Sequence, residues 1–181
     1  PNNAVVGTSS LRRQCQLLAL RPDLNIKWLR GNINTRLKKL DNNEYDAIIL
    51  AAAGIKRMGW ENRISSILDT SECLPAVGQG AIGIETLSTN QTVNKLLSPH
   101  NHAETAYRLM AERALNKQLN GGCQVPIAGH ATINNNNLEL NALVGQVDGK
   151  KIIKASITGS VSEAEALGRE LGNELISKGA K

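Results

Sequence analysis

The chain has 181 residues, of which 41% are hydrophobic and 20% charged, and its formal net charge is +5. These values are typical of a folded protein of one or two domains, and they exclude disordered, collagen-like and coiled-coil classes. No apolar run approaches the roughly 18 residues of a membrane span, and the N-terminus lacks the pattern of a secretion signal. We therefore expect a cytoplasmic protein with no membrane partner.

The positive charge is concentrated at one end of the sequence. Residues 1–60 contain ten lysines and arginines against four acids, a balance of +6, whereas the remaining residues sum to −1. Such a focused charge predicts an anionic partner, which is either a nucleic acid or a small polyanion that carries carboxylates or phosphates. Composition alone leaves both possibilities open.

The cysteine content argues against a disulfide framework or a zinc site. Cys15, Cys73 and Cys123 are an odd set without C-x-x-C spacing, so no metal is predicted. We expect Cys15 and Cys73 to be buried as small hydrophobic residues, as free cysteines usually are.

Residues 1–80 alternate short apolar runs with helical patterns, which is typical of βα units around a parallel sheet. Helices are predicted at residues 10–20 and after Asn32, and only a short turn after Gly54. The third strand is mostly apolar, as expected when both faces of a sheet are covered. The predicted strands cover residues 4–6, 25–29 and 46–51.

Residues 74–99 show mixed signals, and residues 81–100 are predicted to cross between two domains. A helix is then expected from Asn101, which would cap it with Glu104 three residues on, to about Leu119. A second helix is predicted to open with Ser162 and Glu165 in the same spacing, and to bury Ala164, Leu167, Leu171 and Leu175.

Between these helices the sequence predicts an antiparallel meander. Asp148 and Gly149 suggest a type I′ hairpin between its last two strands. The predicted fold is therefore an α/β domain with a parallel sheet at residues 1–80, followed by a small α+β domain with a three-stranded antiparallel sheet at 101–181. The predicted strands of this meander cover residues 125–133, 138–147 and 151–158.

Polar and basic side chains follow the strands of the first half at the edge where open α/β proteins bind ligands. Thr8, Ser9 and Ser10 precede a helix N-terminus, which attracts anions. Arginines in that first turn are disfavoured by the helix dipole, so a bound polyanion would explain them better than stability does. The alternative is that all of them are solvated surface charges. Only Arg12 and Arg13 lie in that first turn. Arg30 leaves the second strand at the same edge, and Arg36 lies one to two turns into the following helix, so the four arginines could converge on one cleft.

The second unusual feature is Cys123, which follows Gly121 and Gly122 after a predicted helix. Glycines allow positive φ and close backbone approach, and they leave the sulfur uncrowded. A thiol presented in this way could be a nucleophile or a covalent attachment point. The alternative is a structural cysteine.

Four segments, in order along the chain, closely resemble the porphobilinogen deaminases, also called hydroxymethylbilane synthases. They are VGTSSLRRQ (6–14), LRGNINTR (29–36), LPAVGQG (74–80) and GGCQVPI (121–127). The resemblance implies a transferase of haem biosynthesis that joins four porphobilinogen molecules into hydroxymethylbilane with release of ammonia. It also implies that the enzyme is a monomer, and that the first domain is of the periplasmic-binding-protein type.

The resemblance also implies roles for individual residues. Cys123 would hold a dipyrromethane cofactor through a thioether, and Gln79 would lie by a hinge and near the substrate. The residues expected to bind the cofactor are Thr8, Ser9, Ser10, Arg12, Arg13, Arg30 and Arg36, of which Arg30 and Arg36 would also bind substrate.

The resemblance further implies that the sequence is a C-terminal fragment. The family's catalytic aspartate belongs to an N-terminal domain that has no counterpart here, so no catalytic residue is assigned and the fragment alone is expected to be inactive. Residues 81–100 would return to that missing domain.

Two other functions remain as alternatives. A nucleic-acid-binding module would use the basic half, but this half shows no aromatic stacking platform and no known binding motif. A periplasmic anion-binding domain shares the architecture, but the missing export signal and the Gly-Gly-Cys loop argue against it.

Overall fold

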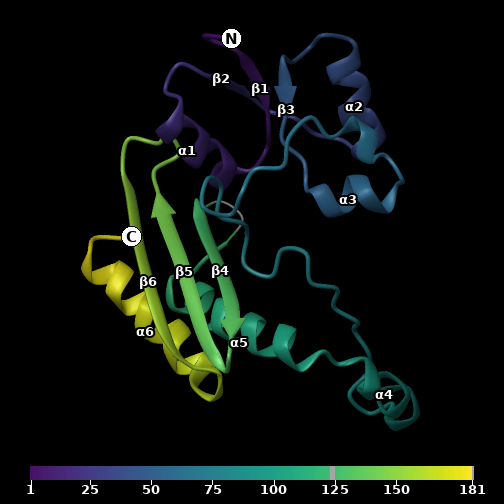
Figure 1. Cartoon of the computed structure of the whole chain (residues 1–181), viewed down its shortest axis with the longest axis vertical. Helices are drawn as coiled ribbons and strands as arrows, with labels where there is room; N and C mark the ends of the chain where they lie inside the picture. Colours follow the sequence, from purple (N-terminus) through teal and green to yellow (C-terminus); the bar gives the residue numbers. More distant parts are fainter. Residues whose placement is uncertain (123–124, 181) are drawn as a thin grey trace.

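The computed structural model describes residues 1–122 and 125–180, which form two separate three-stranded sheets with flanking helices (Figure 1). The first sheet is parallel in the order β2-β1-β3, and the second is antiparallel in the order β4-β5-β6. This is the predicted fold class, an α/β unit followed by an α+β unit. The strands are β1 (Val5–Gly7), β2 (Asn25–Lys27), β3 (Ala47–Ile48), β4 (Ile127–Asn134), β5 (Asn137–Gly145) and β6 (Ile152–Ser160).

The first two helices begin at short polar side chains, as predicted. Ser10 caps α1 (Leu11–Leu20), and Asn32 caps α2 (Ile33–Asp41) through its Oδ1, which accepts from the Thr35 N–H at 2.9 Å. Such a cap satisfies an N–H that has no partner inside the helix. The predicted short turn after Gly54 is instead a helix, α3 (Ala52–Arg57).

The hydrophobic core of this first unit is small. β2 and β3 are shorter than predicted, and β3 has only two residues. Ala47 is exposed and Ile48 only half-buried, so the expectation that β3 is covered on both faces was wrong. The buried hydrophobic residues before residue 60 are Ala4, Val6, Cys15, Leu29, Leu37 and Ile55.

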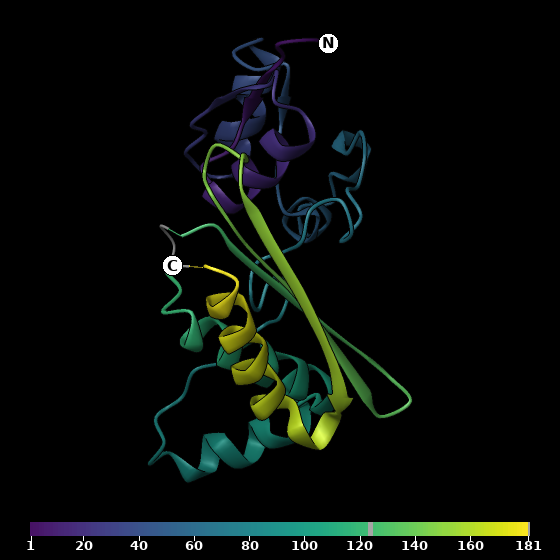
Figure 2. The ribbon, with the colours of Figure 1, turned by 90° about the vertical axis from the view of Figure 1, so that its left-hand side faces the viewer.

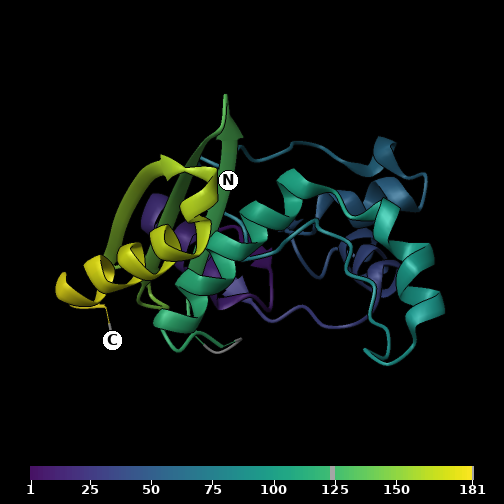
Figure 3. The same ribbon diagram turned by 90° about the horizontal axis from the view of Figure 1, so that it is seen from below.

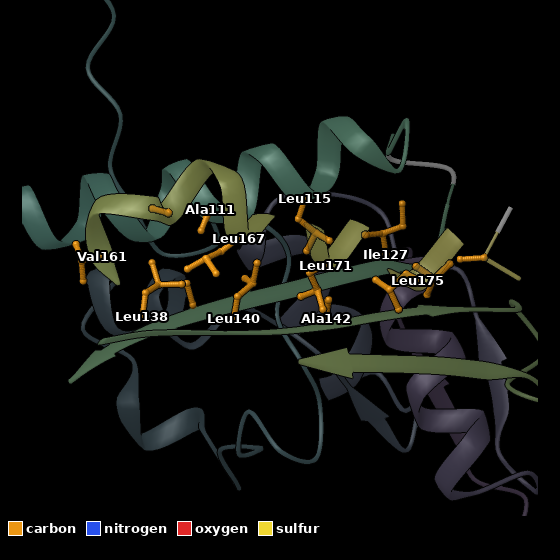
Figure 4. Close-up of a cluster of buried hydrophobic side chains, with 14 residues drawn as sticks. Ala111, Leu115, Ile127, Leu138, Leu140, Ala142, Val161, Leu167, Leu171 and Leu175 are labelled. Carbon is orange, nitrogen blue, oxygen red and sulfur yellow. The ribbon is translucent and has the colours of Figure 1, made fainter. Parts of the chain in front are cut away.

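The larger core lies between the antiparallel sheet and two helices, α5 (Ala103–Gln118) and α6 (Ala164–Ser177). Both helices cover the same face of the sheet, and the β5 side chains Leu138, Leu140 and Ala142 point toward them (Figures 2 and 4). The predicted inward face of α6 is confirmed. Its buried members are Ala164, Leu167, Leu171 and Leu175, which pack against Leu115, Leu138 and Leu140.

The turns of the meander differ from prediction. Asn134 pairs with Asn137, and the two residues between them, Asn135 and Asn136, have φ of 48° and 64°. Positive φ at both central residues is what a type I′ turn requires. At the predicted site only Gly149 has positive φ, and the loop runs from residue 146 to residue 151. The hairpin there is confirmed, but its turn type was wrong.

Both predicted capping boxes of the second half were wrong. His102, not Asn101, caps α5, since its Nδ1 accepts from the Thr105 N–H at 3.3 Å. A 3-10 turn, η3 (Val161–Glu163), precedes α6 and is capped by Ser160 rather than Ser162.

The two units contact each other where the β5–β6 hairpin meets α1 (Figure 2). A Cβ on Gly149 would lie 2.5 Å from the Ala19 nitrogen and 2.8 Å from the Cys15 carbonyl oxygen, so only glycine allows this approach. Cys15 is fully buried against Gly145, as predicted for a small hydrophobic side chain. Burial raises the pKa of its thiol, which keeps it protonated and unreactive.

Residues 81–90 contain no helix or strand, and the chain here extends away from both sheets toward α4 (Gln91–Leu97) (Figures 1 and 3). Ile82, Ile84 and Leu87 are 77%, 63% and 74% exposed. The remaining short elements are η1 (Glu61–Arg63) and η2 (Ser98–His100). Within residues 1–122 and 125–180, no helix is long and apolar enough to span a membrane.

Candidate anion-binding site

The acids and the predicted arginines of residues 1–60 lie at opposite edges of the parallel sheet. Asp23 precedes β2, Asp46 precedes β3, and Asp41 ends α2, which places all three at the edge where the strands begin. They are engaged there: Asp46 accepts from the Val5 N–H at 2.7 Å, Asp23 pairs with Arg21 at 2.6 Å, and Asp41 pairs with Arg63 at 2.5 Å. The opposite edge is therefore left with a concentrated positive charge.

Arg13 lies at the centre of this positive edge. Its Nη1 donates to the Ile49 carbonyl oxygen, just after β3, at 2.9 Å. Burial lowers the pKa of Arg13 from its ordinary value, and the positive charge of Arg36 acts in the same direction. The two guanidinium groups therefore repel each other, and a bound anion would relieve this repulsion.

Arg12 lies beside Arg13 and contacts a later part of the chain. Its Nη2 donates to Gln79 Oε1 at 3.3 Å. The half-buried thiol of Cys73 lies near both arginines; burial raises the pKa of this thiol, and the two positive charges oppose the shift. We refer to Arg12, Arg13 and Arg36 as the arginine cluster.

The hydroxyl groups of the β1–α1 loop mainly hold the loop in place. Thr8 is buried, and its Oγ1 accepts from the Ser10 N–H at 3.2 Å. Ser9 Oγ donates to the Leu29 carbonyl oxygen at 2.5 Å, which ties the ends of β1 and β2 together. These contacts bring the predicted Thr8, Ser9 and Ser10 to the N-terminus of α1, next to the arginine cluster.

Arg30 does not belong to the arginine cluster and contacts an aromatic ring instead. Its guanidinium group stacks over the Trp28 ring, 5.1 Å from the ring centroid, and Trp28 is 59% exposed. The basic half therefore does contain an exposed aromatic side chain next to an arginine, contrary to the sequence argument. Arg36 is held near the same loop, because its Nε donates to the Gly31 carbonyl oxygen at 2.7 Å.

Cys123 lies outside the described residues, and the described chain before it ends at Gly122. Gly121 donates its N–H to the Asn116 carbonyl oxygen at 2.8 Å, and a Cβ at Gly121 would overlap the Asn116 side chain. The expected close approach is therefore confirmed at Gly121. The expected positive φ lies one residue earlier, at Asn120, with 49°.

A hollow of about 510 Å³ lies between the outer face of the antiparallel sheet and the first unit. Gln16 and Leu74 line one side, and His130 and Asn141 line the other. It does not include the arginine cluster. Within residues 1–122 and 125–180, no group of three or more His, Cys, Asp or Glu side chains is placed to hold a metal ion.

His130 gives this region a dependence on pH. Burial lowers the pKa of His130 below its ordinary value of 6.5, Arg108 acts in the same direction, and Glu112 opposes the shift. The unfolded chain therefore binds a proton at a pH where the folded protein does not. We expect the free energy of unfolding to fall as pH decreases below about 6.5, through the lower pKa of the folded state.

Urea unfolding between pH 7.5 and 4.5 measures this dependence against a His130→Gln variant. The free energy of unfolding of the wild type should fall more, as the pH decreases from 7.5 to 4.5, than that of His130→Gln. His100→Gln is the control, because His100 is exposed. Parallel curves for the wild type and His130→Gln would contradict the assignment.

Three residues of this region gave no signal in the sequence analysis. Gln16 and Glu112 are buried polar residues, and Trp28 is an exposed aromatic one. Gln16 and Glu112 lie in amphipathic helices, in which a polar residue is expected to face the solvent. Their burial could be found only from contacts between distant parts of the chain.

Two family models match the chain. Residues 1–95, more than half of its length, match the porphobilinogen deaminase, dipyromethane cofactor binding domain. Residues 106–177 match the porphobilinogen deaminase, C-terminal domain. The first match assigns a dipyrromethane cofactor to the family's α/β unit, where the arginine cluster lies. The chain therefore belongs to the porphobilinogen deaminase family.

Proposed function

We propose that this chain is part of a hydroxymethylbilane synthase, a transferase that joins four porphobilinogen molecules head to tail, with release of ammonia, into hydroxymethylbilane. The observation that carries the proposal is the arginine cluster at the carboxyl edge of the parallel sheet. Porphobilinogen bears two carboxylates on its pyrrole ring, and a chain of such rings is a dense polyanion. Guanidinium groups bind carboxylates with paired, directional hydrogen bonds.

Each residue of the cluster has a distinct part in this proposal. Arg13 is oriented by the Ile49 carbonyl oxygen and Arg36 by the Gly31 carbonyl oxygen, so both present their remaining N–H groups in fixed directions. Arg12 is oriented by Gln79. Arg30, which stacks on Trp28, is proposed to reach substrate carboxylates from the β2 side of the same edge.

The guanidinium groups of the arginine cluster suit the dipyrromethane cofactor. The four carboxylates of this cofactor need several cations and not one. We propose that Cys123 holds this group through a thioether, and that Thr8, Ser9, Ser10, Arg12, Arg13, Arg30 and Arg36 line its site. Arg30, Arg36 and Gln79 would bind substrate. When bound, the cofactor supplies the pyrrole carbon to which the first substrate is joined.

We further propose a division at residues 1–80, 81–100 and 101–181, with the middle segment crossing to another domain. The exposed apolar side chains of Ile82, Ile84 and Leu87 support this, since such side chains are normally covered. The family's catalytic aspartate is not assigned to any residue here. We therefore propose that these 181 residues alone do not turn over porphobilinogen.

Intact mass spectrometry tests the cofactor assignment on protein purified from cells that express the full gene. We expect a mass increase of two pyrrole units that is lost in Cys123→Ser. An adduct that persists in the variant, or no adduct on the wild type, would overturn it. Turnover of porphobilinogen by the purified 181-residue chain would overturn the proposed inactivity.

The remaining parts of the proposal concern partners and location. We propose a cytoplasmic monomer whose anionic ligands are small pyrroles and not nucleic acids. Because Trp28 is exposed beside Arg30, nucleic-acid binding needs a direct test. A mobility shift with single-stranded DNA and RNA at about 0.15 M salt is expected to be negative, and a salt-sensitive shift would contradict the proposal.

A further inference from the structure

Residues 74–79, which we call the bridging segment, are bound on one side by the α/β unit and on the other by the α+β unit. On the first side, the buried Gln16 of α1 pairs with Leu74 in both directions. Its Oε1 accepts from the Leu74 N–H at 2.8 Å, and its Nε2 donates to the Leu74 carbonyl oxygen at 3.0 Å. On the second side, the Gly129 N–H of β4 donates to the Pro75 carbonyl oxygen at 3.2 Å.

The strongest of these contacts comes from Glu112, in the middle of α5. This side chain is only 4% exposed, and a buried carboxylate is costly unless hydrogen bonds satisfy it. Its Oε2 accepts from the Gly78 N–H at 2.6 Å, and its Oε1 accepts from the Ala131 N–H at 2.8 Å. One carboxylate therefore joins the bridging segment to β4.

The turn that Glu112 holds leads directly to the arginine cluster. Gly78 has φ of 71°, and the Gln79 N–H donates to the Ala76 carbonyl oxygen at 3.0 Å, which closes the turn. Gln79 Oε1 then accepts from the Ala76 N–H and from Arg12 Nη2, both at 3.3 Å. Hydrogen bonds from Ala131 and Gly78 to Glu112, the peptide bond between Gly78 and Gln79, and the hydrogen bond from Arg12 to Gln79 thus connect β4 with the arginine cluster.

We propose that Glu112 is a positioning residue. By holding the turn at Gly78 it orients the Gln79 side chain, and through Gln79 it sets the Arg12 guanidinium relative to the α+β unit. The importance of Arg12 for pyrrole carboxylates rests on the proposed function, whereas the structural connection does not. Without Glu112 the bridging segment would keep the Gly129–Pro75 hydrogen bond to β4, but it would lose the carboxylate that fixes the turn at Gly78 next to Gln79 and Arg12.

The test compares Glu112→Gln with Glu170→Gln, an exposed glutamate on α6. The glutamine amide accepts from one of the two N–H groups and turns its own NH₂ toward the other. Site-resolved amide hydrogen exchange should show faster exchange at Gly78 and also at Ala76, by at least about tenfold, in Glu112→Gln only. Faster exchange confined to Ala131, with Ala76 unchanged, would reduce Glu112 to a local structural role and overturn the proposal.

A second measurement tests whether the contacts from Glu112 to Arg12 affect ligand binding. Calorimetric titration with porphobilinogen should show weaker affinity in Glu112→Gln, by about fivefold or more, and in Gln79→Met. If Glu112 acts through Gln79, the double variant binds no more weakly than Gln79→Met alone. Additive losses would mean that Glu112 does not act through Gln79, and would overturn the proposal.

Two further outcomes are also decisive. If Glu112→Gln does not fold, Gln79→Met replaces it, because Gln79 is exposed and its loss should still speed exchange at Ala76 and weaken porphobilinogen binding. Unchanged exchange at Ala76 in that variant counts against the proposal. If the wild-type chain does not bind porphobilinogen, the proposed function fails for this chain, and the exchange data alone decide whether Glu112 holds the turn.

Discussion

Replacement of Gly168 by alanine is expected to destabilise the α+β unit by about 3 kcal/mol or more, which is at or above the upper end for overpacking a core. Gly168 lies on α6 where this helix crosses α5. A Cβ there would overlap the Ala111 carbonyl oxygen, and would lie 2.8 Å from Ala114 Cβ and 3.0 Å from the Leu115 nitrogen. These are backbone and Cβ atoms, so no rotamer change can make room, and the two helices would have to separate.

The control for this prediction is Gly83→Ala. A Cβ on Gly83 would meet no atom within 4 Å and its φ is not positive, so alanine should change stability by no more than about 0.5 kcal/mol. Urea unfolding followed by circular dichroism measures both variants. Equal midpoints for Gly168→Ala and the wild type would mean that the α5–α6 crossing is looser than described.

Replacement of Arg13 by glutamine is expected to have the largest effect on ligand binding. A hydrogen bond between charged groups contributes about 1.5–3 kcal/mol, so the affinity for porphobilinogen, used as a single-pyrrole probe of the proposed cofactor site, should fall by roughly 10- to 150-fold. Arg13 is chosen because it is the most central member of the arginine cluster, between the Ile49 carbonyl oxygen and Arg36. Loss of its charge also removes the repulsion on Arg36, which offsets part of the cost of losing the hydrogen bond to the Ile49 carbonyl oxygen.

Calorimetric titration of porphobilinogen measures this effect, with Arg169→Gln as the matched control. Arg169 is exposed on α6 and pairs with Glu165 at 2.6 Å, far along the chain from the cluster. It should leave the affinity unchanged. The same affinity in Arg13→Gln as in the wild type would remove Arg13 from the proposed ligand set.

Features that depend on neighbours in sequence could be predicted. Ser10 and Asn32 are recognisable as helix starts because a cap acts within three residues. Leu167, Leu171 and Leu175 are recognisable as a buried face because helical periodicity places them together. The edge at which the arginines lie follows from βα topology alone.

Features that depend on distant contacts could not be predicted. Glu112 bonds to Gly78, 34 residues away, and Gln16 bonds to Leu74, 58 residues away. The sequence around each residue therefore does not show its partner. The two caps that were wrong, at Asn101 and Ser162, each lay within two residues of the true cap, where several polar residues compete for the role.

The separation of acids and arginines at opposite edges of the parallel sheet also affects how fast a ligand arrives. It gives this unit an electric dipole whose positive end is the arginine cluster, so a small dianion is drawn to that edge before any contact forms. The attraction reaches about 30 Å at 0.01 M salt but only about 8 Å at 0.15 M. Association should therefore slow as salt increases, while dissociation, which is governed by the short-range hydrogen bonds, changes less.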